Sequence, residues 1–123
     1  MAARDYAIAA AVAEAVRPFG VPILGMASTE HETAYRDQNV ELIPEFYAEL
    51  GYDDAGNLIL SRVHEAVDPS RARERVLRAL REHVVSTTGG HDIAVKAATI
   101  CVHSDTPAAA TLVAELSRAL RSA

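Results

Sequence analysis

The sequence predicts an α/β fold with mostly parallel short strands and flanking helices, in a single domain over residues 1–123. Three observations lead to this prediction. Short apolar runs alternate with longer segments whose apolar residues recur at helical spacing, as in βα units. The chain is 50% apolar and 24% charged, which is typical of a globular protein. Its 123 residues suffice for one domain.

The first half of the chain is expected to contain two helices, two short strands and a final helical piece. The Ala-rich first helix ends where Pro18 breaks it, and the second strand is expected to stop at Pro44. The second helix opens with Thr29 and Glu32, which have the spacing of a capping box. The expected ranges, in chain order, are 4–17, 21–26, 28 onward, 39–43 and 45–50.

The second half is expected to contain a turn, a strand, a helix, a second turn, two strands and a last helix. These ranges are 53–57, 58–60, 68–84, 87–90, 91–95, 98–102 and 105 onward. Asp68 and Pro69 are typical of a helix start. The helix after them carries an apolar stripe of Val76, Leu77, Leu80 and Val84. Its basic residues are expected on a solvated face: Arg71, Arg73, Arg75, Arg78 and Arg81. The inner face of the last helix is expected to be Leu112, Val113, Leu116 and Leu120.

Charge and motif content exclude several classes of function. The net charge is −5 and the pI is near 5.5, which argues against nucleic-acid or membrane binding. The single cysteine, Cys101, excludes a disulfide framework and a multi-cysteine zinc site, and it is expected to be a buried structural thiol. No phosphate-binding glycine loop, H-E-x-x-H or G-x-S-x-G motif is present. No secretory signal is recognised, so a cytoplasmic location is expected.

The most informative segment runs from Ile100 to Pro107, where a buried strand gives way to polar residues and a helix. His103 and Asp105 are two positions apart, so in an extended chain their side chains point the same way. Such a pair could share a proton, hold a substrate or supply two metal ligands. The helix start near Thr106 adds backbone donors for an anion. Alternatively, Asp105 or Thr106 only caps the helix.

Two further positions are weaker candidates for a site. Glu30, beside His31, lies near a strand-to-helix junction, where binding residues of α/β folds often occur. Arg62 follows a short strand and could pair with an acidic group. For both positions a solvated surface role is the alternative. The remaining histidines, His64, His83 and His91, lack metal-ligand spacing, and no metal site is expected.

Several segments together resemble one family. Ile100 to Pro107 reads I-C-V-H-S-D-T-P, which resembles the I-C-V-H-G-D-T-P signature of the LamB/YcsF family. Residues 45–58 resemble its E-x-F-A-D-R-x-Y-D-x-D-G-x-L segment, with Arg62 at the arginine that follows. Gly25 and Glu30 resemble its G-L-A-x-S-E stretch. Departures from the family pattern are Ser104 for glycine, Glu49-Leu50 for Asp-Arg, and Ala98 for aspartate.

This resemblance implies a partial TIM-like β/α barrel of the glycoside hydrolase and deacetylase type, with this chain as the C-terminal half. It implies the A subunit of 5-oxoprolinase, which opens the lactam 5-oxoproline to glutamate at the expense of ATP, together with B and C subunits. His103 and Asp105 would be the catalytic residues. Glu30, Arg62 and Thr106 would contact the substrate.

Three functions remain open from the sequence. The chain could be part of a 5-oxoprolinase A subunit that is inactive alone, because the family's N-terminal motifs are not in it. It could be a truncated, non-catalytic paralogue that binds or oligomerises. It could be a fragment of a metal-dependent deacetylase or hydrolase. A homodimer is expected, because half of a barrel leaves strand edges and an apolar face uncovered.

Overall fold

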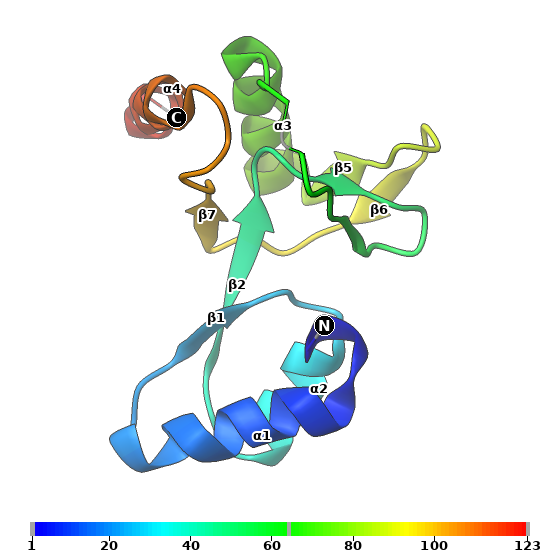
Figure 1. Cartoon of the computed structure of the whole chain (residues 1–123), viewed down its shortest axis with the longest axis vertical. Coiled ribbons are helices and arrows are strands. Elements are labelled where there is room, and N and C mark those ends of the chain that lie inside the picture. The colour runs from blue at the N-terminus through cyan, green and yellow to red at the C-terminus, as the bar shows by residue number, and fades with distance from the viewer. Residues whose placement is uncertain (1, 64, 123) are drawn as a thin grey trace. The chain divides into compact units, whose positions relative to one another are not determined.

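A computed structural model describes residues 2–63 and 65–122 of the chain. The chain divides into two compact units, Met1–Glu45 and Phe46–Ala123. The single domain expected over 1–123 stays a prediction. In the first unit two short 3-10 helices, Ala2–Arg4 and Arg17–Phe19, flank the helix α1, Tyr6–Val16. After them come β1 Ile23–Gly25, α2 Glu30–Asp37 and the beginning of β2, Leu42–Tyr47, in the order shown in Figure 1.

The two helices of the first unit pack side by side around small side chains (Figure 1). Fully or nearly fully buried residues at this contact include Ala9, Ala13, Ala34 and Tyr35. Alanine at the contact lets two helix backbones approach closely, so the Ala-rich pattern of α1 builds the core directly. The expected helix over 4–17 is confirmed. Its N-cap is Asp5, whose carboxylate accepts from the Ile8 N–H at 3.1 Å.

The start of α2 differs in detail from the expected capping box. Thr29 is the N-cap, but its hydroxyl accepts from the His31 N–H at 3.2 Å. Glu32 reaches back to the N–H of Ser28 at 2.7 Å. Thr29 thus satisfies a backbone donor that the first turn of a helix leaves without a partner, and Glu32 holds the residue that precedes the N-cap.

Strand β2 pairs in parallel with β1, and it does not stop at Pro44. Leu42 lies opposite Ile23, and Pro44 lies opposite Gly25. The N–H of Ile23 donates to the carbonyl of Glu41 at 2.9 Å. Only alternate residues of a strand bond to a given neighbour, and in β2 the bond of Glu41 to β1 leaves Pro44 on the side that faces away from β1. The N–H that proline lacks is therefore not needed in this ladder. The expected helical turns over 45–50 are therefore wrong.

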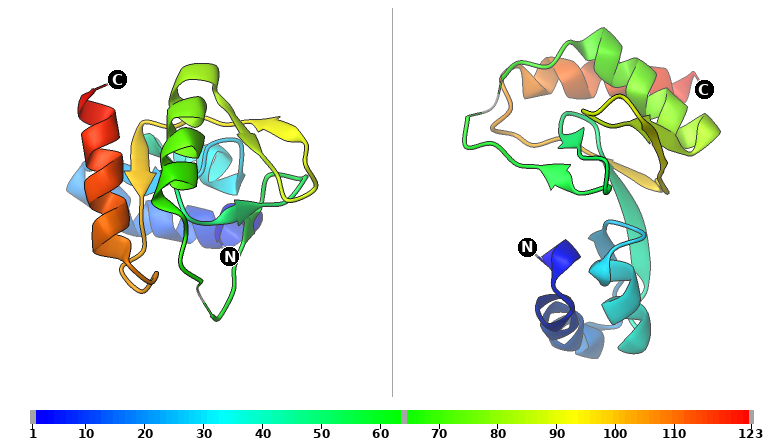
Figure 2. Two further views of the ribbon diagram at one scale, coloured as in Figure 1. Left: turned by 90° about the horizontal axis from the view of Figure 1, so that it is seen from above. Right: turned by 90° about the vertical axis from the view of Figure 1, so that its right-hand side faces the viewer.

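The second unit holds the rest of β2 and seven further elements (Figures 1 and 2). These are β3 Gly51–Tyr52, β4 Leu58–Ile59, α3 Pro69–Glu82, β5 Val84–Ser86, β6 Asp92–Ala94, β7 Thr99–Cys101 and α4 Ala109–Arg121. Strand β7 neighbours β2 in the hydrogen-bonded order, and the N–H of Ala48, just after β2, donates to the carbonyl of Cys101 at 3.1 Å. Figure 2 shows α3 and α4 beside each other, and the two helices are in contact.

Two antiparallel hairpins replace part of the expected parallel sheet. Strand β3 pairs with β4, and β5 pairs with β6. The connections, residues 53–57 and 87–91, are too short for the crossover that parallel strands need, which takes about a dozen residues. In the first connection the Asp53 carboxylate accepts from the N–H groups of Ala55 and Asn57 at 3.0 and 2.8 Å, which confirms the expected turn.

Helix α3 begins as predicted and ends earlier than predicted. Asp68 is its N-cap and accepts from the Ser70 N–H at 2.8 Å. The helix ends at Glu82 because His83 takes a left-handed conformation, with φ of 58°. Val84, expected on the helix stripe, therefore begins β5. Arg78 of α3 then holds the second hairpin through a forked contact with the carboxylate of Asp92.

The described residues form a mixed α/β structure with a parallel strand pair and flanking helices. Within the described ranges no helix is long and apolar enough to cross a membrane.

Candidate functional site

The predicted site segment lies where expected, just past the carboxyl end of β7. Cys101 is the last residue of the strand and is only half-buried, and His103 follows two residues later. From His103 the chain turns, and the Thr106 N–H donates to the His103 carbonyl at 3.2 Å. The segment 103–106 is therefore not extended. The expectation that His103 and Asp105 point the same way depends on an extended chain, and it loses that basis.

Helix α4 starts two residues later than Pro107 and without a side-chain cap. Its N-cap is Ala108, at φ of 60° in the left-handed region. Capping by Asp105 or Thr106 is therefore wrong. Ser104 has no positive φ, since the described non-glycine residues that do are Ser28, Asn39, His83 and Ala108. Serine in place of the family's glycine consequently causes no backbone strain at position 104.

The partner of His103 is Glu49. Glu49 lies two residues beyond the end of β2, as His103 lies two residues beyond the end of β7. Its Oε1 accepts from the backbone N–H of His103 at 2.7 Å and also contacts the ring atom Nδ1. The Glu49 side chain is only 1% exposed, whereas that of His103 is 40% exposed. A carboxylate buried against one imidazole nitrogen leaves the other nitrogen toward the more open side.

This contact assigns the ring protons of His103. The Glu49 carboxylate only accepts hydrogen bonds, so Nδ1 carries the proton and Nε2 carries the lone pair of the neutral ring. Tyr47 stacks on the imidazole, with ring centroids 5.8 Å apart and an interplanar angle of 14°. The ring is thus held by a carboxylate at its edge and by an aromatic side chain at its face. Nε2 is then available to take or give a proton, the role of a general base or acid.

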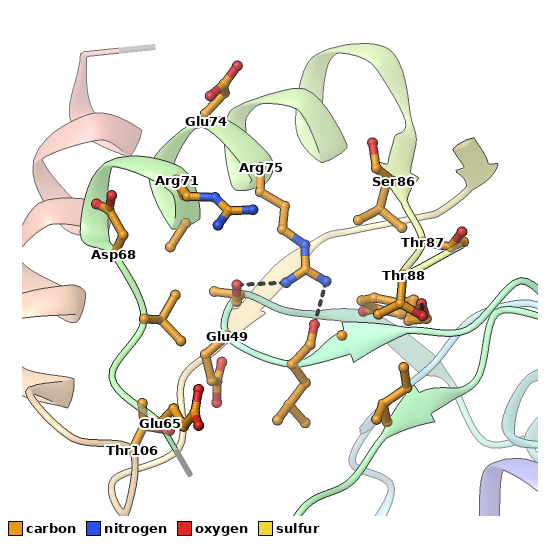
Figure 3. Close-up of a pocket in the computed structure, with 18 of the residues that line it drawn as sticks. Glu49, Glu65, Asp68, Arg71, Glu74, Arg75, Ser86, Thr87, Thr88 and Thr106 are labelled. Atoms are coloured by element: carbon orange, nitrogen blue, oxygen red, sulfur yellow. Dashed lines mark hydrogen bonds between the residues drawn. The ribbon is translucent and has the colours of Figure 1, made fainter. Parts of the chain in front are cut away.

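A cavity of about 1000 Å³ in the second unit is lined in part by Glu49 (Figure 3). Two of the lining residues each carry a buried polar atom that has no hydrogen-bond partner among the described residues. These atoms are Oε2 of Glu49 and Oγ1 of Thr106. Buried polar atoms without partners cost free energy, and they are found where a ligand or water completes the bonding. Other lining residues include Glu65, Asp68, Arg71, Glu74, Arg75 and Thr87.

One arginine of the expected solvated face is not solvated. Arg75 is half-buried, and its guanidinium donates to the carbonyl of Ala48 at 3.1 Å and to the carbonyl of Leu50. Figure 3 shows both bonds as dashed lines. Helical spacing alone could not separate Arg75 from its neighbours, because the residues that desolvate it lie on a different segment.

The structure gathers some of the candidate residues and leaves others apart. Thr106 lines the cavity with Glu49, and Asp105 is an exposed residue of the turn. Arg62 is exposed and is not among the described lining residues. Glu30 is the first residue of α2 and belongs to the first unit. Across the described ranges no group of three or more His, Cys, Asp or Glu side chains could hold a metal ion.

Glu49 is the site residue that the sequence does not single out. In the sequence it stands out only as a departure from the family's aspartate. An acidic residue two positions after an apolar strand, within a segment that matches a family motif, is the signal that could have found it.

The fold and the site define an α/β protein with a histidine–carboxylate pair beyond the ends of two neighbouring strands. A model of the LamB/YcsF family matches residues 1–123, so the chain belongs to the LamB/YcsF family.

Named relatives agree with this assignment. The chain is 35% identical to a protein of Chloroflexus aggregans named as the A subunit of 5-oxoprolinase, over all of this chain and 50% of that protein. It is 32% identical to the "Lactam utilization protein lamB" of Emericella nidulans, over 87% of this chain and 44% of that protein. The crystal structure of a lactam utilization protein from Thermus thermophilus matches with a TM-score of 0.84 and 30% identity, over 98% of this chain and 49% of that one. The chain therefore spans about half the length of these relatives.

Proposed function

We propose that this chain contributes the Glu49–His103 pair to the A subunit of a 5-oxoprolinase. The reaction is the ATP-dependent opening of the lactam 5-oxoproline to glutamate. The observation that carries the proposal is the buried carboxylate of Glu49 on Nδ1 of His103, beyond the ends of two strands. The names of the relatives supply the substrate class, and the pair supplies acid–base chemistry that fits it.

Opening a lactam requires one proton transfer that a histidine can perform. Water adds to the ring carbonyl carbon and gives up a proton to the histidine, the carbon–nitrogen bond breaks, and the ring nitrogen takes up that proton to become the amine of glutamate. In the proposal His103 moves this proton at Nε2, while Glu49 keeps Nδ1 protonated and stabilises the imidazolium. Asp105 is the second catalytic group proposed. Glu30, Arg62 and Thr106 are proposed to contact the substrate, and ATP is a substrate that the chain handles together with the B and C subunits.

The proposal includes that the described chain is inactive without the rest of the barrel. It spans about half of its relatives. The N-terminal half of the LamB/YcsF family carries the motifs N-C-D-L-G-E, H-A-G-D and K-P-H-G-A-L-Y. These motifs are absent from this sequence. A partial TIM-like barrel, completed by the N-terminal half, would place those groups at the strand ends, where such barrels carry their active sites.

The test is glutamate release from 5-oxoproline and ATP. We expect no turnover by the chain alone and turnover when a family N-terminal half and the B and C subunits are added. His103→Ala in the complete mixture should abolish it. Turnover by the chain alone, or no loss in His103→Ala, would contradict the proposal. No turnover by the complete mixture would favour a non-catalytic binding module instead.

A further inference from the structure

The guanidinium of one arginine forms hydrogen bonds with the backbone on both sides of Glu49. Arg75 of α3 donates to the carbonyl of Ala48 at 3.1 Å and to the carbonyl of Leu50. These are the residues immediately before and after Glu49. The guanidinium is planar and has donors at fixed angles, so two carbonyls bound at once set both the position and the orientation of the segment between them.

Two aromatic rings hold the guanidinium itself. The rings of Phe46 and Tyr52 stack with centroids 5.7 Å apart, and Arg75 Cζ lies 5.4 Å from one centroid and 5.3 Å from the other. Burial lowers the pKa of Arg75 from its ordinary value, while Tyr52 and then Glu49 favour its charged form. Phe46 is 1% exposed and Tyr52 3% exposed, so this support is part of the core of the second unit. Cation–π contacts of this kind are stronger where water is excluded.

The carboxylate of Glu49 has little else to fix it. Oε1 bonds to His103, whereas Oε2 has no partner among the described residues. A side chain held through one oxygen depends on the placement of its own backbone. Without the bonds from Arg75, the segment 48–50 would keep the bond from the Ala48 N–H to Cys101, and the carbonyls on either side of Glu49 would lose the donor that holds both of them.

We propose that Arg75 is a positioning residue: by binding the carbonyls of Ala48 and Leu50 it directs the Glu49 carboxylate onto Nδ1 of His103. The proposal rests on the proposed function only in treating His103 as the reacting group. Arg75 itself contacts the backbone and two rings, and it takes no part in proton transfer. A purely structural arginine would stabilise the second unit and leave the protonation of His103 unchanged.

The test is the tautomer of His103 in the isotopically labelled 123-residue chain, measured by ring nitrogen NMR at a pH where the imidazole is neutral. The wild-type chain should show the Nδ1–H tautomer. Arg75→Met keeps the length and helix preference of the side chain but removes both bonds. We expect it to shift the ring to the Nε2–H tautomer, which predominates in water. Glu49→Leu, which leaves no acceptor at Nδ1, should do the same. Arg75→Lys keeps the charge but offers one nitrogen in place of two, so an intermediate tautomer population is expected.

Arg71→Met is the matched control. Arg71 lies one helical turn earlier on α3 and lines the same cavity. Its substitution removes a positive charge there but keeps the two hydrogen bonds of Arg75 to the backbone. The control should keep the Nδ1–H tautomer. A folded Arg75→Met chain with an unchanged tautomer would overturn the proposal, as would an equal shift in Arg71→Met. If neither Arg75 variant folds, the residue serves stability and the positioning role is overturned. Because no turnover is measured, a negative 5-oxoprolinase assay leaves this test intact.

Discussion

Glu49 has a buried carboxylate that contacts the imidazole ring of His103. Its carboxylate accepts from both the backbone N–H and the Nδ1 of His103. We predict that Glu49→Gln lowers kcat of the complete 5-oxoprolinase mixture by about 10²–10⁴-fold, because His103 acts as the general acid or base only with the carboxylate at its Nδ1. KM should change little, because the variant alters proton transfer more than substrate contact. Glu14→Gln, on the exposed side of α1, is the control and should keep wild-type turnover. A Glu49→Gln enzyme with full kcat would remove Glu49 from the mechanism.

His31 is the residue through which we expect the stability of the first unit to depend on pH. Its Nδ1 accepts from the Met26 N–H at 3.1 Å, and its ring stacks on Tyr35 with centroids 5.3 Å apart. Burial lowers the pKa of His31 below its ordinary value of 6.5. The folded state therefore favours the neutral ring. The contribution of His31 to the free energy of unfolding is fully present above the ordinary pKa and is lost as the pH falls through the lowered pKa.

The prediction is a lower free energy of unfolding at acid pH that depends on His31. Urea unfolding between pH 8 and pH 5 should show a smaller pH dependence in His31→Asn, whose amide oxygen can accept the same bond but does not titrate. The exposed His91 offers the matched control, and His91→Asn should keep the wild-type pH dependence. Identical pH profiles for His31→Asn and the wild type would refute the assignment.

At the scale of single elements, the start of α4 carries an avoidable strain. Ala108 adopts φ of 60°, where a side chain costs roughly 1–2 kcal/mol and glycine is at ease. We predict that Ala108→Gly raises the free energy of unfolding by up to about 1 kcal/mol, because relief of the strain exceeds the added entropy of the unfolded chain. Ala110→Gly, two residues later within α4, should instead lower it by about 0.5–1 kcal/mol. Denaturant unfolding of both variants decides it, and the same sign for both would contradict the account.

The elements also show which local signals are sufficient. Thr29 and Asp68 each cap a helix, as their residue types and positions predict, and Asp5 caps α1 without having been predicted. The alternation of short strands and helices does not predict the antiparallel hairpins, although the short connections 53–57 and 87–91 already exclude a parallel crossover. Pro44 lies within a strand and does not end it, because the residue type alone does not tell which side of the strand faces its neighbour.

For the whole molecule, exposed apolar side chains favour association. Phe19 is 75% exposed, Leu60 71% and Val63 75%. We predict a homodimer, with a mass near twice 13.2 kDa by light scattering at micromolar concentration. Dilution should shift the mass toward the monomer. A stable monomer at tens of micromolar would show that these side chains need no partner copy.

The site is predictable in part. The signature around His103 predicts a strand end, and the structure has the segment just past β7, because a polar segment between an apolar strand and an amphipathic helix is a local pattern. The resemblance to the family shows leucine at position 50 where the family has arginine. In the structure a guanidinium does reach this segment, from Arg75 on α3. No periodicity along α3 distinguishes that arginine from Arg71 or Arg78.

The sequence by itself determined the α/β class, the helices and most of their caps, the LamB/YcsF resemblance and the segment that carries His103. These depend on neighbouring residues, whose spacing acts on the local backbone. Only the tertiary structure decided that His103 pairs with Glu49, 54 positions away, and that Arg75 holds the backbone around that carboxylate. Such contacts depend on which strands lie side by side and on which charges lose their water. Both are set when distant segments pack together, and a reading along the chain contains neither.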